Sequence, residues 1–138
     1  MIRTLLGLGL ALCCAVSALA AKWHVAGDGN DGSDGRSPAT AWRTLQLAES
    51  AVKPGDVVLV GNGFYTSANT DTGDGGAVLN MRTSGTADAW ITWKARPGHQ
   101  PEIAPIGWAG SQITGSFLIV EGFTVTGAND SIVLLDAL

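Results

Sequence analysis

Short apolar runs separated by connections rich in Gly, Asx and Pro make up the chain from Asp56 onward. The runs are Val57–Val60, Ala77–Met81, Ile91–Lys94, Glu102–Ala104, Phe117–Val120, Phe123–Thr126 and Ile132–Leu135. Runs of this length between turn-forming residues predict β-strands. Most connections are longer and less regular than the two-residue Asn-Gly or Asp-Gly turns typical of antiparallel hairpins. No helix alternates with these strands, so the pattern also disfavours βαβ units.

The spacing of two similar runs adds a second constraint. Ile91 and Leu118 are 27 residues apart, which is the length of one three-strand coil in a β-solenoid. In stacked coils we expect the side chains of Leu118, Val120 and Val125 to face the interior. Trp93, which alternates with Ile91, is expected there too. The sequence does not repeat strictly, so this periodicity alone leaves a β-sandwich open.

One short helix is predicted over residues 45–53. Thr44 suits the N-cap position, and Leu45, Ala48 and Val52 recur on one face at helical spacing. A Pro-Gly pair follows and ends the helix. A helix of this length is too small to be an independent unit, so its apolar face must cover another apolar surface.

The stretch from Gly27 to Thr40, GDGNDGSDGRSPAT, is predicted to be a loop. Oxygen ligands for calcium are offered there by Asp28, Asn30, Asp31 and Asp34. The EF-hand pattern fails, because the fifth position counted from either Asp28 or Asp31 is a glycine. We therefore expect Asx-rich turns in this loop.

Residues 1–20 are typical of a secretory signal peptide, with a positive start, an apolar run and the small-residue pattern Ala-Leu-Ala. We expect cleavage after Ala20 and a secreted or periplasmic location. An uncleaved membrane anchor is the alternative, but the apolar run is about as short as a spanning helix can be. Cys13 and Cys14 would leave with the signal, so the mature chain would form no disulfide and no thiolate metal site.

The balance of charge limits the classes of partner. The 138 residues include 8 basic and 12 acidic side chains, a net charge of −4. Loss of Arg3 with the signal would make the mature net charge about −5. Such a balance argues against nucleic acid and membrane surfaces as partners. It would also repel an acidic polysaccharide unless a local basic cluster or a bound cation intervened.

Three blocks of sequence, in a fixed order, carry a resemblance to a known family. Trp23–Thr66 contains WHVAGDGNDGSDG, SPATAWRTLQLA, KPGDVVLV and GNGFYT, Ser84–Ile103 reads SGTADAWITWKARPGHQPEI, and Phe117–Ala128 reads FLIVEGFTVTGA. Together these blocks resemble the N-terminal part of bacterial pectate-lyase-like β-helix proteins. Trp90 stands where that family usually has proline, a difference that affects one turn.

The resemblance implies an all-β fold: a right-handed parallel β-helix with an N-terminal capping helix and the first two to three coils. Residues 21–55 would form the first strand, the loop and the capping helix, and residues 56–138 the coils. The helix would then be the lid on the first coil, and Glu121-Gly122 the corner between two sheets. The apolar run that ends at Leu135 has no polar cap after it, so we expect a truncated sequence.

The resemblance further implies a secreted protein that acts on an acidic polysaccharide, such as pectin, alginate or a glycosaminoglycan, by β-elimination. Family members carry their catalytic residues on middle coils, and calcium is a candidate cofactor of the full-length protein. Two other interpretations stay open: a non-catalytic β-helix that serves as a surface or glycan-binding module, and an inactive gene fragment. We expect a monomer, with no membrane partner once the signal is removed.

Individual residues give weaker signals. Lys94 and Arg96 lie in a block whose role is structural, and His24 and His99 suit surface positions better than a metal site. Aspartates in loops are turn residues first, and tryptophans fill cores more often than they bind sugar rings. The residues considered in this way are Asp71, Asp74, Asp88, Asp130, Trp90 and Trp108. We assign no catalytic, cofactor-binding or metal-binding residue, and we expect the 138-residue chain to be inactive as a lyase by itself.

Overall fold

The computed structural model describes residues 19–66, 77–106 and 109–127, together with the backbone of 131–135. Asp71, Asp74, Trp108 and Asp130 lie outside the described residues, as does the predicted signal sequence up to residue 18. Among the helices that are described, none is long and apolar enough to cross a membrane.

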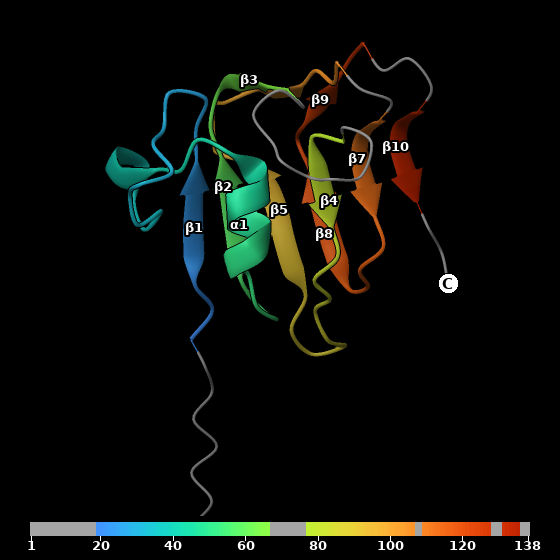
Figure 1. Ribbon diagram of the computed structural model, residues 1–138. Coiled ribbons are helices and arrows are strands. Elements are labelled where there is room, and N and C mark those ends of the chain that lie inside the picture. The colour runs from blue at the N-terminus through green and yellow to red at the C-terminus, as the bar shows by residue number, and fades with distance from the viewer. Residues whose placement is uncertain (1–18, 67–76, 107–108, 128–130, 136–138) are drawn as a thin grey trace, which may run out of the picture.

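Three parallel sheets surround one core (Figure 1). The first contains β1 (Lys22–Val25), β2 (Val57–Val60), β5 (Ile91–Ala95) and β8 (Leu118–Glu121); the second contains β3 (Gly63–Tyr65), β6 (Pro101–Ile103) and β9 (Thr124–Val125); the third contains β4 (Leu79–Met81), β7 (Ala109–Ile113) and β10 (Ser131–Leu135). Neighbouring strands pair in parallel in each sheet. The prediction of a right-handed parallel β-helix is confirmed, and the β-sandwich is excluded.

Each coil passes through the three sheets in turn, so β2, β3 and β4 form one coil, β5 to β7 the next and β8 to β10 the third. Ile91 pairs with Leu118, which confirms the predicted 27-residue coil. One inward-facing row consists of Trp23, Val58, Trp93 and Val120. Trp93 is completely buried in this row, as predicted.

The ends of the predicted strands lie within two residues of the observed ends. The sequence did not predict β3 or β7. The sequence of β7, AGSQI, has no apolar run from which a strand could be predicted. It forms a strand because it pairs with β4 on one side and β10 on the other, and its small residues Ala109 and Ser111 are buried. Pairing with neighbours outweighs weak local propensity here.

The helix α1 covers Leu45–Ala51 and ends two residues earlier than predicted. Pro54 disfavours helical backbone just before it, and the chain is already extended at Val52. Thr44 is the N-cap residue, but its hydroxyl donates to Asp31 at 3.0 Å and makes no capping bond. The predicted apolar face is buried, at Leu45, Ala48 and Val52.

Side chains of α1 close the free edge of β4. Gln46 Oε1 accepts a hydrogen bond from the backbone N–H of Asn80 at 3.0 Å. Glu49 Oε1 accepts from the backbone N–H groups of Arg82 and Thr83 at 2.9 and 2.7 Å. These oxygens replace the carbonyls that a preceding strand would provide. Figure 1 shows α1 at the head of the row β4, β7 and β10, which confirms its predicted place as a lid.

The loop after β1 closes the free edge of the first sheet. The N–H groups of His24 and Ala26 donate to the carbonyls of Gly35 and Trp42, each at 2.8 Å. The Trp42 ring stacks on Trp23 with the ring centroids 4.9 Å apart, so it lies at the start of the inward-facing row. We call α1, β1, Trp42, this loop and the segment around Asp56 the capped end of the coils.

The opposite end, formed by β8 and β9, is called the open end. Gly122 makes the predicted corner there, with φ of +80° and an added Cβ only 2.9 Å from the Cβ of Ala95. Val120 lies in the inward-facing row, as predicted, yet its side chain is 43% exposed. Leu118 and Val125 are only partly buried. The register points these side chains inward, but within the described residues β8 and β9 are the last strands of their sheets.

Candidate functional site

A hollow forms on the outer surface of the first sheet, just beyond the carboxyl ends of its strands. Strands β1, β2 and β5 end in register, so the next residues, Ala26, Gly61 and Arg96, form one outward-facing row. Ala26 and Gly61 are small. A Cβ added at Gly61 would lie 3.3 Å from the Cβ of Ala26 and 3.6 Å from Nδ1 of His99. The small residues therefore leave space beside Arg96 that a larger pair would fill.

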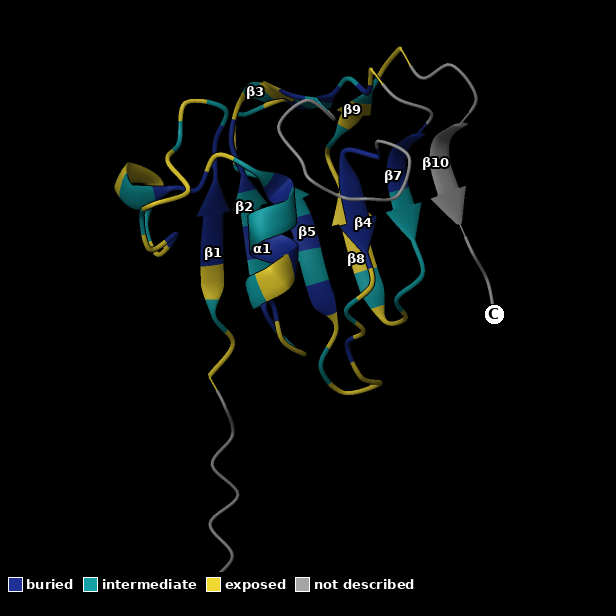
Figure 2. Ribbon diagram, in the orientation of Figure 1, coloured by how far each residue is buried: buried dark blue, intermediate teal, exposed yellow. Residues whose placement is uncertain are grey.

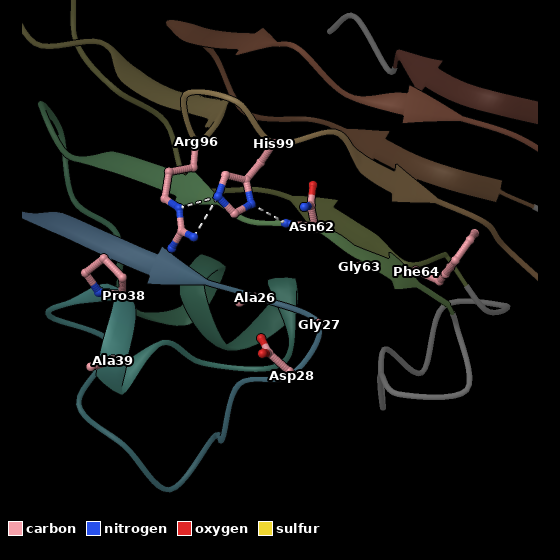
Figure 3. A pocket seen from close by; sticks show the side chains of 10 residues that line it. All are labelled: Ala26, Gly27, Asp28, Pro38, Ala39, Asn62, Gly63, Phe64, Arg96 and His99. Carbon is pink, nitrogen blue, oxygen red and sulfur yellow. Dashed lines mark hydrogen bonds between the residues drawn. The ribbon is translucent and has the colours of Figure 1, made fainter.

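A groove of about 660 Å³ occupies this space. Its lining consists of Ala26, Gly27, Asp28, Pro38, Ala39, Asn62, Gly63, Phe64, Arg96 and His99. Figure 3 shows Arg96 and His99 on one side of the groove and Asp28 on the other. A second hollow of about 300 Å³ shares Asp28 with it. The groove is within the range of about 300–1,000 Å³ that is usual for ligand sites, and residues from successive coils line it.

His99 joins Arg96 to the loop between β2 and β3. The backbone N–H of Asn62 donates to His99 Nδ1 at 3.0 Å. The Arg96 guanidinium approaches His99 Nε2 with Nε at 3.0 Å and Nη2 at 2.7 Å. A neutral imidazole accepts at only one nitrogen, yet donors face both. The Arg96 guanidinium gives this corner of the groove a positive charge, and the Asp28 carboxylate lines the opposite side.

The floor of the groove is held rigidly by backbone contacts. Gly27 donates its N–H to the carbonyl of Asn62 at 3.0 Å. The approach is so close that a Cβ at Gly63 would lie 2.6 Å from the Cα of Gly27. Tyr65 donates its hydroxyl to the carbonyl of Gly61 at 2.9 Å. The polar groups above this floor are thus preorganised.

Arg96 also acts on the ionisable groups around it. Burial lowers the pKa of His24, and the positive charges of Arg96 and Lys22 lower it further. Burial raises the pKa of Tyr65 well above its usual value, and the Asp28 carboxylate adds to that shift. His24 and Tyr65 are therefore neutral at pH 7, and Arg96 is a fixed positive charge of the groove.

Polar side chains of the loop after β1 form hydrogen bonds to backbone N–H groups in or next to the loop. The Asp31 carboxylate accepts hydrogen bonds from the N–H groups of Arg43 and Thr44 at 2.7 and 3.0 Å. Asn30 closes an Asx turn by accepting from the backbone N–H of Gly32. Asp34 does the same with Arg36, and the Thr40 hydroxyl and that N–H lower the pKa of Asp34. The predicted Asx-rich turns are confirmed.

Calcium, which the resemblance implied for the full-length protein, does not fit the residues described. No group of three or more His, Cys, Asp or Glu side chains among them is placed to hold a metal ion. The carboxylates of Asp31 and Asp34 accept hydrogen bonds from backbone N–H groups instead.

The prediction that both histidines lie at the surface is wrong for His24, which is only 9% exposed. His99 is partly buried and belongs to the groove. Lys94 lies on β5 and outside the groove lining, whereas Arg96 is the residue that follows the strand.

The exposed aromatic side chains belong to two separate places. Trp90 is 46% exposed and meets the edge of Phe117, with the ring centroids 5.6 Å apart. Both precede strands of the first sheet, whereas the groove follows the strands. Phe64 is the aromatic residue of the groove and is 71% exposed. Asp88 is exposed in the turn between Thr86 and Ala89, as expected.

Sequence reasoning missed that Asn62 and His99 lie together. The positions of the two connections in the sequence could have shown this. GNG follows β2 and RPGH follows β5, so aligning the ends of two strands of one sheet would have placed the two connections side by side. The small residues Ala26 and Gly61 would then have marked the hollow.

Two solved lyases are similar to this chain. One is a rhamnogalacturonan lyase, with 25% sequence identity and a TM-score of 0.62 over 77% of this chain and 28% of the lyase. The other is the pectate lyase Pel9A, with 23% identity and a TM-score of 0.60 over 75% of this chain and 27% of that enzyme. No family model and no curated relative matches the sequence. The chain is therefore a pectate-lyase-like parallel β-helix that spans little more than a quarter of the length of these two lyases.

Proposed function

We propose that this chain is the N-terminal part of a secreted protein that binds acidic polysaccharide and whose full-length form is a polyuronate lyase. The observation that carries the proposal is the match of the stacked coils to two polysaccharide lyases. The positive charge of Arg96 in the groove supports the binding of a carboxylate.

The proposed reaction is β-elimination. A base removes the C5 proton of a uronate, the electron pair of that bond forms the C4–C5 double bond, and the 4-linked sugar leaves with the glycosidic oxygen. The step requires a neutralised carboxylate and a free base. Arg96 supplies a positive charge, but its guanidinium is engaged with His99. We therefore assign binding to this part of the chain and the catalytic base to other coils of the full-length protein.

Binding is tested with the purified mature chain and polygalacturonate, using fully methyl-esterified pectin as the uncharged reference. Arg96→Gln is expected to weaken the affinity for polygalacturonate about tenfold, because a charge-assisted contact is lost. Lys94→Gln is the matched control, since it removes the same charge two residues away and outside the groove. We expect it to change the affinity less than about twofold. Equal affinity for the esterified and the charged polymer would refute acidic-polysaccharide binding.

Catalysis is tested by following the absorbance of unsaturated uronate on pectate, alginate and chondroitin. The 138-residue product is expected to show no turnover. An in-frame extension beyond Leu138, if the genomic DNA encodes one, is expected to restore it when expressed with this chain. Turnover by the 138 residues alone would contradict our assignment of the base. Binding without turnover in the extended protein would favour the non-catalytic glycan-binding alternative, which the groove also supports.

Secretion is tested by N-terminal sequencing of the exported protein. The expected first residue is Ala21. An intact N-terminus in the membrane fraction would support the anchor instead.

A further inference from the structure

Asp56 is a buried carboxylate at the start of β2. It is 4% exposed. Its Oδ1 accepts a hydrogen bond from the backbone N–H of Ala21 at 2.8 Å, and its Oδ2 accepts from Trp23 Nε1 at 2.9 Å and from the backbone N–H of Lys53 at 3.0 Å. All three donors are uncharged N–H groups. One carboxylate therefore holds the beginning of β1, the end of the helical segment and the start of the first complete coil.

A buried carboxylate is costly to desolvate unless it is paired with a positive charge. Among the described residues the polar partners of Asp56 are the three neutral donors and no lysine or arginine side chain. The hydrogen bonds offset part of the cost. The position is therefore one where a cation of the right size would add stability.

Ala21 is held at a fixed place beside this carboxylate. Its carbonyl accepts the N–H of Val57 at 2.9 Å while its own N–H donates to Asp56. The predicted signal cleavage site is the peptide bond between Ala20 and Ala21. Hydrolysis of that bond adds one water, leaves a carboxylate on Ala20 and frees the amine of Ala21, which is protonated at neutral pH.

We propose that the amino group released at Ala21 forms an ion pair with Asp56, so that signal cleavage itself stabilises the capped end. This inference rests on the secretion part of the proposed function. The nitrogen that donates a neutral N–H in the precursor becomes an ammonium group at the same position. The bond from the neutral N–H to the carboxylate is already assisted by one charge, and the ammonium group adds a second, opposite charge beside Asp56. The precursor lacks this contribution, and the mature chain gains it without any movement of the fold.

The test compares three N-termini on otherwise identical mature chains: free Ala21, N-acetylated Ala21, and Ala21 preceded by one glycine. Acetylation keeps the N–H donor and removes only the charge, and the glycine moves the ammonium group by one residue. We expect the folding equilibrium constant of the free form to exceed that of either other form about tenfold. Denaturant unfolding of the three proteins measures this ratio. A free form no more stable than the acetylated form would overturn the proposal.

Asp56→Asn provides the second half of a double-mutant cycle. In that background the three N-termini are expected to differ by less than about threefold, and an undiminished difference would show that the ammonium group acts elsewhere. Should Asp56→Asn fail to fold, the acetylated and free forms of the wild-type chain still decide the question. The chains are prepared by cleavage of a fusion protein, so the result does not depend on export. Sequencing of the exported protein tests the cleavage site separately.

Discussion

The two ends of the coils bury the same kind of position to different extents. Val58 and Val120 belong to one inward-facing row, yet Val58 is 0% exposed and Val120 is 43% exposed. Figure 2 shows the contrast between the buried strands near the capped end and the exposed surface of β8. Register determines which way a side chain points, whereas the neighbouring coils determine how far it is buried.

The ends also differ in what closes the backbone. At the capped end, side-chain oxygens of Gln46 and Glu49 accept the N–H groups that an earlier coil would have paired. Apolar cover comes from Trp42, stacked on Trp23. Polar side chains thus satisfy the backbone N–H groups at the end of a solenoid, as pairing between strands does within it.

The largest effect is expected for Asp56→Ala at the capped end. It leaves three N–H donors without their acceptor, and we expect the free energy of unfolding to fall by about 3 kcal/mol or more. Glu121→Ala removes an exposed carboxylate at the open end and is expected to change stability by less than about 0.5 kcal/mol. Urea unfolding measures both. Similar losses at the two ends would mean that the cap carries no special stability.

Glu49→Ala tests the closure of β4 by the helix. Two backbone N–H groups lose their partner, so a loss of about 2 kcal/mol is expected. Glu49→Gln retains a side-chain oxygen and should recover more than half of it. The measurement is again denaturant unfolding, with amide hydrogen exchange at Arg82 and Thr83 as a local readout. Unchanged exchange in Glu49→Ala would contradict the edge-closing role.

Val58→Ala and Val120→Ala compare the ends with one chemical change. Removing two buried methyl groups at Val58 is expected to cost about 1.5–2 kcal/mol. The same truncation at Val120 should cost less than half as much, because that side chain is already 43% exposed. Equal thermal shifts for the two variants would show that Val120 is covered in solution.

The sequence was sufficient for the parts of the fold that depend on local pattern. Val57–Val60 was predicted with its observed bounds, and the spacing of Ile91 and Leu118 gave the coil length. The strand β7 could not be predicted, because its small and polar residues become a strand through pairing with β4 and β10. This strand therefore forms because of its neighbours in the stacked coils and not because of its own sequence.

The groove was harder to predict than the fold. Arg96 and His99 lie close in sequence, but Asn62 joins them from 37 residues away. The loop after β1 runs along that strand through backbone contacts of Gly35 and Trp42. Such contacts link segments that no local pattern connects. The sequence therefore identified these residues one by one without showing which of them meet.

His24 gives the smallest expected effect and places a pH response at the capped end. Burial and the charges of Arg96 and Lys22 lower its pKa in the folded chain, so the unfolded chain takes up the proton more readily. The stability that depends on neutral His24 is complete above the ordinary pKa of about 6.5 and declines as the pH falls through the lowered value. His24→Gln removes this dependence. Unfolding measured between pH 7.5 and 5 should show the wild-type chain losing stability relative to the variant as the pH falls. A difference that stays constant with pH would mean that the pKa of His24 is the same in the folded and the unfolded chain, and the response would then have to come from another group.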